Sequence, residues 1–159
     1  MENKMRSESM KGMSNQKFTV MMLISFFIMY IVMFLNIDDA SHYHTSLTRI
    51  YMALMMVAPM AVPMMGLMGK MYPSKKTNTG IMLAGVVVLI VALIGLRTQT
   101  PVGDVQYMKA MIPHHSSAIM VSKHAHIQAP EVKKLSEQII QSQEKEISEM
   151  NQMIQRLSK

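Results

Sequence analysis

The residues with the clearest chemical potential lie in one short segment, YMKAMIPHHSSAIM, at positions 107–120. It combines three methionines with the adjacent pair His114 and His115, and Pro113 directly precedes that pair. Proline inside a helix removes a backbone hydrogen bond and bends the helix. Thioether sulfur and imidazole nitrogen are ligands that suit soft metal ions such as Cu(I). The segment therefore predicts either a metal site or a buried histidine pair that is satisfied by a carboxylate.

The composition limits the classes of protein to consider. Of the 159 residues, 22 are Met, and both Cys and Trp are absent. Without Cys there are no disulfides and no thiolate zinc sites, while Met can act as flexible apolar filler or as a soft ligand. The formal net charge is +6, but the cations do not cluster as in a nucleic-acid-binding face. We expect no nucleic acid partner, and because no nucleophile–base pair or nucleotide-binding loop is visible, no enzymatic activity.

Three apolar segments precede the histidine pair, at 18–37, 50–69 and 80–96. A membrane-spanning helix needs about 20 apolar residues. The first segment is not followed by a small-residue cleavage site, so we interpret it as a retained helix rather than a signal peptide. The second contains Pro59 and Pro63, which membrane helices tolerate. We predict an all-α membrane protein with three transmembrane helices over 18–97.

The positions of the cations predict the orientation of these helices in the bilayer. Positive residues flank the first helix on its N-terminal side and fill the loop after the second, namely Lys4, Arg6, Lys11, Lys17, Lys70, Lys75 and Lys76. The loop after the first helix instead carries Asp38 and Asp39, with Arg49 at its far edge. By the positive-inside rule, the tail 1–17 is cytoplasmic and everything after Arg97 is extracytoplasmic. We expect a multi-pass protein of the cytoplasmic or inner membrane.

Residues 98–159 are expected to form an extracytoplasmic helical hairpin, with helices at 103–127 and 130–157. At about 100° per residue, the central stripe of the first helix holds Asp104, Met111, His115, Ala118 and Ser122, flanked by Tyr107, Met108 and His114. The stripe of the second helix holds Val132, Ile139, Glu146, Met150 and Leu157, flanked by Leu135, Gln143 and Met153. Glu146 then lies in the middle of an apolar face, where an unpaired carboxylate is costly. It requires a partner, which the histidines could supply directly or through a shared metal.

These motifs resemble the domain of unknown function 305 family, ferritin-like helical proteins that include CopM-type periplasmic copper- and silver-binding proteins. The resemblance covers about 98–157 and rests on Asp104, Tyr107, MIPHH at 111–115, AI at 118–119, PEVKKLSEQII at 130–140, Gln143, Glu146–Ile147 and Met150. The family often places a methionine one residue after Met120, where this chain has Val121, so Met120 is not expected to be a ligand. The three preceding helices indicate a membrane-anchored branch of the family. Because members often have more helices than this hairpin, the resemblance implies that chains associate to complete a bundle.

The predicted function is binding of Cu(I) or Ag(I) at the cell envelope, for metal tolerance or handling. The expected ligands are Met108, Met111, His114, His115, Glu146, Met150 and Met153. Glu146 could instead orient a histidine, since carboxylate suits Cu(I) poorly. The expected partners are the lipid bilayer, further copies of the chain and a copper donor or acceptor protein, and no organic cofactor is expected.

Two other functions remain open at this point. Met52, Met56, Met60, Met64 and Met68 recur every four residues, which is typical either of a Cu(I) conduit or of Met packing around two prolines. Alternatively, the hairpin is a structural assembly module in which a His–Glu pair fixes the register of the helices. The loop sequence DDASHYH offers Asp38, Asp39, His42 and His44 as a Cu(II) or Zn(II) chelate or as ordinary exposed residues. Met5, Met10 and Met13 in the tail follow no regular spacing.

Overall fold

The computed structural model describes residues 15–68 and 74–158, and every regular element in these ranges is a helix. The prediction of an all-α protein is therefore confirmed for the described residues. The predictions that involve Lys4, Arg6, Lys11 and Lys70, and those on Met5, Met10 and Met13, fall outside them. The contacts divide the chain into two compact units, Met1–Tyr30 with Tyr51–Thr98, and Ile31–Ile50 with Gln99–Lys159.

The first unit is built from the apolar helices α2 (Asn15–Val32), α3 (Leu47–Val57), α4 (Ala61–Met68) and α5 (Lys75–Thr98). Two stretches, Leu47–Leu67 and Lys75–Thr98, are long and apolar enough to cross a membrane, by length and composition alone. The apolar part of α2 is shorter, at Gln16–Val32. Two such helices are compatible with a membrane protein.

The first helix ends at Val32, and the prediction that it continues to residue 37 was wrong. The chain turns immediately afterwards, where the Phe34 N–H donates to the Ile31 carbonyl and the Leu35 N–H to the Val32 carbonyl. The reason lies in the second unit, where the buried guanidinium of Arg49 donates to the Met33 carbonyl at 2.6 Å and lies 4.1 Å from the ring centroid of Phe34. These contacts hold the residues after Val32 in a turn.

Proline breaks the second apolar stretch into three parts. A 3₁₀ turn, η2 (Ala58–Met60), separates α3 from α4, and Pro59 lies in its first turn. Proline has no N–H to donate to the preceding helical turn, so the α-helix cannot continue through it unchanged. The break nevertheless leaves one nearly continuous helical run, as the apolar pattern predicted.

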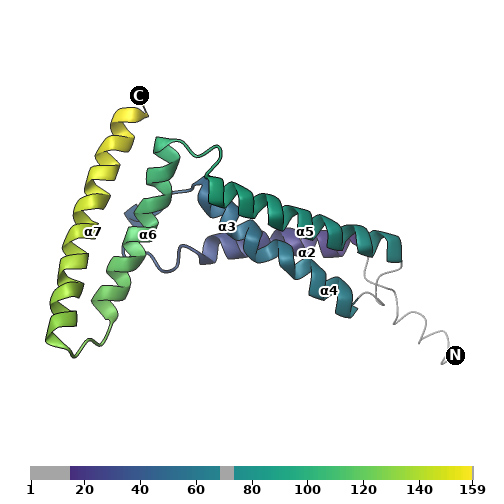
Figure 1. Ribbon diagram of the computed structural model, residues 1–159, viewed down its shortest axis with the longest axis horizontal. Coiled ribbons are helices and arrows are strands. Elements are labelled where there is room, and N and C mark those ends of the chain that lie inside the picture. The colour runs from purple at the N-terminus through teal and green to yellow at the C-terminus, as the bar shows by residue number, and fades with distance from the viewer. Residues whose placement is uncertain (1–14, 69–73, 159) are drawn as a thin grey trace. The chain divides into compact units, whose positions relative to one another are not determined.

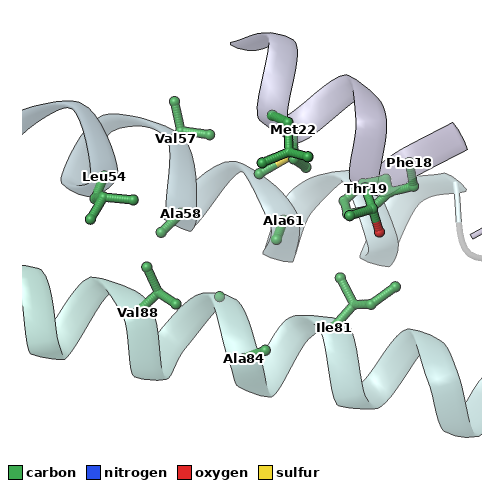
Figure 2. Close-up of a pocket in the computed structure, with 12 residues that line it drawn as sticks. Phe18, Thr19, Met22, Leu54, Val57, Ala58, Ala61, Ile81, Ala84 and Val88 are labelled. Atoms are coloured by element: carbon green, nitrogen blue, oxygen red, sulfur yellow. The ribbon is translucent and has the colours of Figure 1, made fainter. Parts of the chain in front are cut away.

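Small residues allow α5 to approach this run closely. A Cβ added to Gly85 would lie 2.9 Å from the Ala58 carbonyl oxygen and 3.0 Å from the Ala61 Cβ. Close backbone approach through small residues is typical of helix packing in membranes. Figure 2 shows Ala58, Ala61 and Ala84 along an apolar pocket of about 340 Å³. Phe18 of α2 also lines this pocket.

The second unit contains an antiparallel helical hairpin (Figure 1). Its helices are α6 (Asp104–His124) and α7 (Pro130–Leu157), and a short 3₁₀ turn, η1 (Ala40–His42), contacts α6. The second helix has the predicted bounds, whereas α6 ends three residues before the predicted residue 127. Pro130 at the start of α7 and the basic residues Lys123 and His124 in the last turn of α6 match the preferences of helix ends.

The predicted central stripes of the hairpin were displaced by about one residue from the observed core, except at Met150, which belongs to both. The buried core consists of Met108, Ile112 and Ile119 from α6 with Ile147 and Met150 from α7. Glu146 lies at the edge of this core with its side chain 44% exposed, and Leu157 is 51% exposed. Apolar residues occupy the centre, where burial is favourable, and the Glu146 carboxylate stays where water reaches it.

Candidate metal site at the edge of the hairpin

One pocket of about 200 Å³ at the edge of the hairpin brings together most of the predicted ligands. Its lining comprises Tyr107, Met111 and His115 from α6 and Glu146, Glu149, Met150 and Met153 from α7. Five of the seven predicted ligands, Met111, His115, Glu146, Met150 and Met153, are in this set. The pocket thus combines three thioethers, one imidazole and two carboxylates on facing helices.

The imidazole and one carboxylate are in direct contact. His115 Nδ1 lies 3.0 Å from Glu146 Oε2, and the His115 side chain is only 13% exposed. Although the two atoms are close, their alignment does not make a hydrogen bond, and Nδ1 has no hydrogen-bond partner among the described residues. Ser142, one turn earlier on α7, donates to the other carboxylate oxygen at 2.9 Å. Glu146 is therefore oriented by its own helix and presented to His115.

The environment of His115 favours its neutral form. Burial lowers the pKa of His115 below its ordinary 6.5, the charge of Glu146 opposes this shift, and the neighbouring His114 adds to it. Metal ions bind the neutral imidazole, because the coordinating nitrogen must not carry a proton. The lowered pKa of His115 thus favours the protonation state that metal binding requires.

The other two predicted ligands lie elsewhere. Met108 is 6% exposed and belongs to the buried core with Ile112 and Ile147. His114 is exposed, and its ring centroid is 6.1 Å from that of His115 with the ring planes tilted by 62°. Neither residue lines the pocket. Adjacent residues point in directions about 100° apart on a helix, so only one histidine of the pair can face α7.

Two residues of the pocket were missing from the predicted ligand set. Tyr107, 54% exposed, precedes Met111 by one turn, and Glu149 follows Glu146 by nearly one turn. Lys145 lies 3.8 Å from Glu149, so that carboxylate already has a cationic neighbour. Spacing of three or four residues from the predicted ligands was the signal that could have identified both.

The types of donor atom in the pocket fit soft ions better than hard ones. Calcium and magnesium take several oxygen ligands, whereas thioether and imidazole select soft ions such as Cu(I). Among the described residues, no three His, Cys, Asp or Glu side chains come together in a way that could hold a metal ion. His115, whose Nδ1 has no hydrogen-bond partner among the described residues, lines this pocket together with three methionines, which is consistent with a soft-ion site.

The acidic and histidine residues of the first loop, residues 33–46, attach that loop to the hairpin. The Asp38 N–H donates to Ser116 Oγ at 2.7 Å, and His42 Nδ1 lies 2.9 Å from the same oxygen. Asp38 also accepts from Lys123 Nζ at 2.8 Å. The Asp39 carboxylate accepts from the Ser41 N–H, which caps η1, and hydrogen bonds with the Ser41 side chain and backbone lower the pKa of Asp39.

His44 contacts the hairpin as well. Burial lowers its pKa, the charge of Lys109 acts in the same direction, and a hydrogen bond with Asn151 of α7 opposes the shift. The Nε2 atom of His44 is buried without a hydrogen-bond partner. The described residues contain no third His, Cys, Asp or Glu that would join His42 and His44 in a metal-ligating cluster.

The methionines of the second apolar stretch meet different surroundings along its length. Met52 and Met56 are 41% and 44% exposed, while Met64 packs against the buried cluster of Phe18, Ala61 and Met65. None of them lines the apolar pocket of Figure 2, whose one methionine is Met22 of α2. The side chain of Met68 falls outside the described residues.

Comparison with known proteins places the chain in a family. A family profile described as Domain of unknown function (DUF305) matches residues 55–154. The chain belongs to the DUF305 family. The DUF305 match includes η2, α4 and α5 as well as the hairpin, and so begins before the motifs that carried the resemblance. The uncharacterized protein L153 of Acanthamoeba polyphaga mimivirus is 34% identical over 145 residues, covering 89% of this chain and 93% of that protein. No solved structure matches.

Proposed function

We propose that this DUF305 protein binds Cu(I) or Ag(I) in the pocket at the edge of its hairpin and serves metal tolerance or handling. One observation carries the proposal, namely that three thioethers line the same pocket as an imidazole whose pKa is lowered. Thioether sulfur competes poorly for hard ions and well for soft ones. The protein acts by sequestering the ion or by passing it to a donor or acceptor protein, without catalysis.

In this proposal Met111, His115 and Met150 are the principal ligands. Met153, 38% exposed at the rim of the pocket, supplies a further sulfur. Glu146 orients His115 rather than binding the ion, because carboxylate is a poor ligand for Cu(I) and a carboxylate that contacts a ligating imidazole fixes its orientation. His114 and Met108 are not ligands.

The apolar helices anchor the site to a bilayer in this proposal. Leu47–Leu67 and Lys75–Thr98 provide two spans and α2 the third, with the hairpin on the extracytoplasmic side. A second copy associates along α7, because Val132, Leu135 and Leu157 are 45%, 55% and 51% exposed on that helix.

Competition titration of the full-length protein in detergent, with Cu(I) supplied by a chromophoric chelator, tests this proposal. His115→Ala should weaken binding by about tenfold or more, equivalent to about 1.4 kcal/mol. His114→Ala, the adjacent control, should leave affinity close to that of the wild type. Equal affinities in all three proteins would exclude the pocket and favour a structural role for the His–Glu contact.

A further inference from the structure

Helix α6 lacks one backbone hydrogen bond in the middle of the proposed site. Pro113 lies inside the helix and cannot donate the backbone hydrogen bond that would reach the Lys109 carbonyl. Met111 precedes Pro113 and His115 follows it, so the two ligands that α6 contributes stand on opposite sides of this residue. The distance between their donor atoms therefore depends on how the helix bends at Pro113.

The first loop and the start of α3 form hydrogen bonds with α6 on both sides of Pro113. On the N-terminal side, the Leu47 N–H donates to Gln106 Oε1 at 3.2 Å. On the C-terminal side, the Asp38 N–H and His42 Nδ1 both meet Ser116 Oγ, at 2.7 and 2.9 Å. The segment 38–47 thus bridges Pro113 along α6.

Ser116 is the firmest of these attachment points. Its side chain is fully buried, as are those of Ile112, Pro113 and Ile119 around it. A hydroxyl donates one hydrogen bond and accepts two, so Ser116 can satisfy both loop groups at once. The other link, from Lys123 to Asp38 at 2.8 Å and to Glu144 at 3.6 Å, involves a lysine side chain that is 40% exposed, and exposed ion pairs contribute little.

We propose that segment 38–47 fixes the conformation of α6 around Pro113 and thereby positions Met111 and His115 for the ion. Ser116 is then a positioning residue, which touches no ion itself. In this proposal, ion binding and the loop contacts favour the same conformation of α6, so that each stabilises the other. That segment 38–47 fixes α6 is argued from the contacts alone, whereas its coupling to ion binding rests on the proposed function.

Hydrogen–deuterium exchange of the full-length protein in detergent, metal-free and saturated with Ag(I), tests both parts. The variants are Ser116→Ala and the control Ser122→Ala, which changes a serine on the same helix that makes none of the loop contacts. In metal-free protein, Ser116→Ala should speed exchange in residues 38–46 and 105–113, while Ser122→Ala should not. Ag(I) should slow exchange of the loop in the wild type, and its affinity should fall about fivefold or more in Ser116→Ala.

Each contrary outcome identifies a different failure. If hydrogen exchange of residues 38–46 is unchanged in metal-free Ser116→Ala, the claim that segment 38–47 fixes α6 is wrong. Ag(I) could instead protect residues 111–115 and 146–153 while leaving the loop and the affinity of Ser116→Ala unchanged. That result would overturn the coupling between the loop and ion binding, but it would support the pocket as the binding site. Absence of any protection by Ag(I) in the wild type would overturn the proposed function and the coupling together. If Ser116→Ala does not fold, Gln106→Ala carries the same comparison, because it removes the attachment on the other side of Pro113.

Discussion

Replacing two methionines of the pocket by leucine separates the role of sulfur as a ligand from the role of the side chain in packing. Met150 is 9% exposed and belongs to the hairpin core, and Met111 packs against that core. Leucine is apolar and similar in volume, so each Met→Leu change should cost less than about 1.5 kcal/mol of stability. Truncation of Met150 to Ala would cost about 2–5 kcal/mol and confuse the two roles.

The double variant Met111→Leu/Met150→Leu leaves the pocket with one sulfur, that of Met153, beside His115. If each lost sulfur weakens Cu(I) binding tenfold, the double variant binds about 100-fold more weakly, or about 2.8 kcal/mol. This loss should appear while the protein retains its helical signal and melts in one transition close to that of the wild type. The expected signature is therefore a large change in affinity with a small change in stability.

Anaerobic competition against a Cu(I) chelator measures the affinity, and thermal unfolding followed by circular dichroism measures the stability. Met120→Leu is the matched control, since Met120 lies on α6 but does not line the pocket. An affinity in the double variant equal to that in Met120→Leu would refute the assignment of these sulfurs. A loss of affinity that merely follows a loss of stability would refute it as well.

Further predictions follow from other parts of the molecule. Burial lowers the pKa values of His115 and His44 below 6.5, so the unfolded chain binds more protons in acid, and the melting temperature should fall as the pH drops below 6.5. His115→Gln should reduce this dependence, and an unchanged dependence would contradict the attribution to His115. Gly85→Ala should destabilise the apolar unit, because its Cβ would meet Ala58 at 2.9 Å, whereas Gly80→Ala in the same helix meets nothing within 4 Å and should not. Equal melting temperatures would refute the close packing. Leucine at Met56, Met60 and Met64 should leave Cu(I) binding intact, and loss of copper flux into vesicles would instead favour a conduit.

The helices were predictable from the sequence because they depend on local apolar runs and on helix-end signals such as Pro130. The end of the first helix was not predictable, because it depends on contacts between Arg49 and residues 33–34 that only the folded chain brings together. The buried faces of α6 and α7 differ by about one residue from the predicted apolar stripes for a similar reason. A two-helix pattern assumes one packing partner, but Ser116 of α6 also contacts the first loop, far away in sequence.

The candidate site was partly predictable. An ionised side chain in an apolar helical pattern implies a partner, and the expected contact between Glu146 and a histidine is present at His115. The pattern did not decide between His114 and His115, which differ in whether they face α7. Nor did it reveal that Met108 enters the core, because core and ligand methionines share the same helical spacing.

X-ray absorption at the copper edge, on full-length protein purified without chelators from copper-fed cells, tests the central claim most directly. The account predicts Cu(I) bound to a mixture of sulfur and nitrogen neighbours, with fewer sulfur neighbours in Met111→Leu/Met150→Leu. Protein that contains no copper, or copper surrounded by nitrogen and oxygen alone in both proteins, would contradict it.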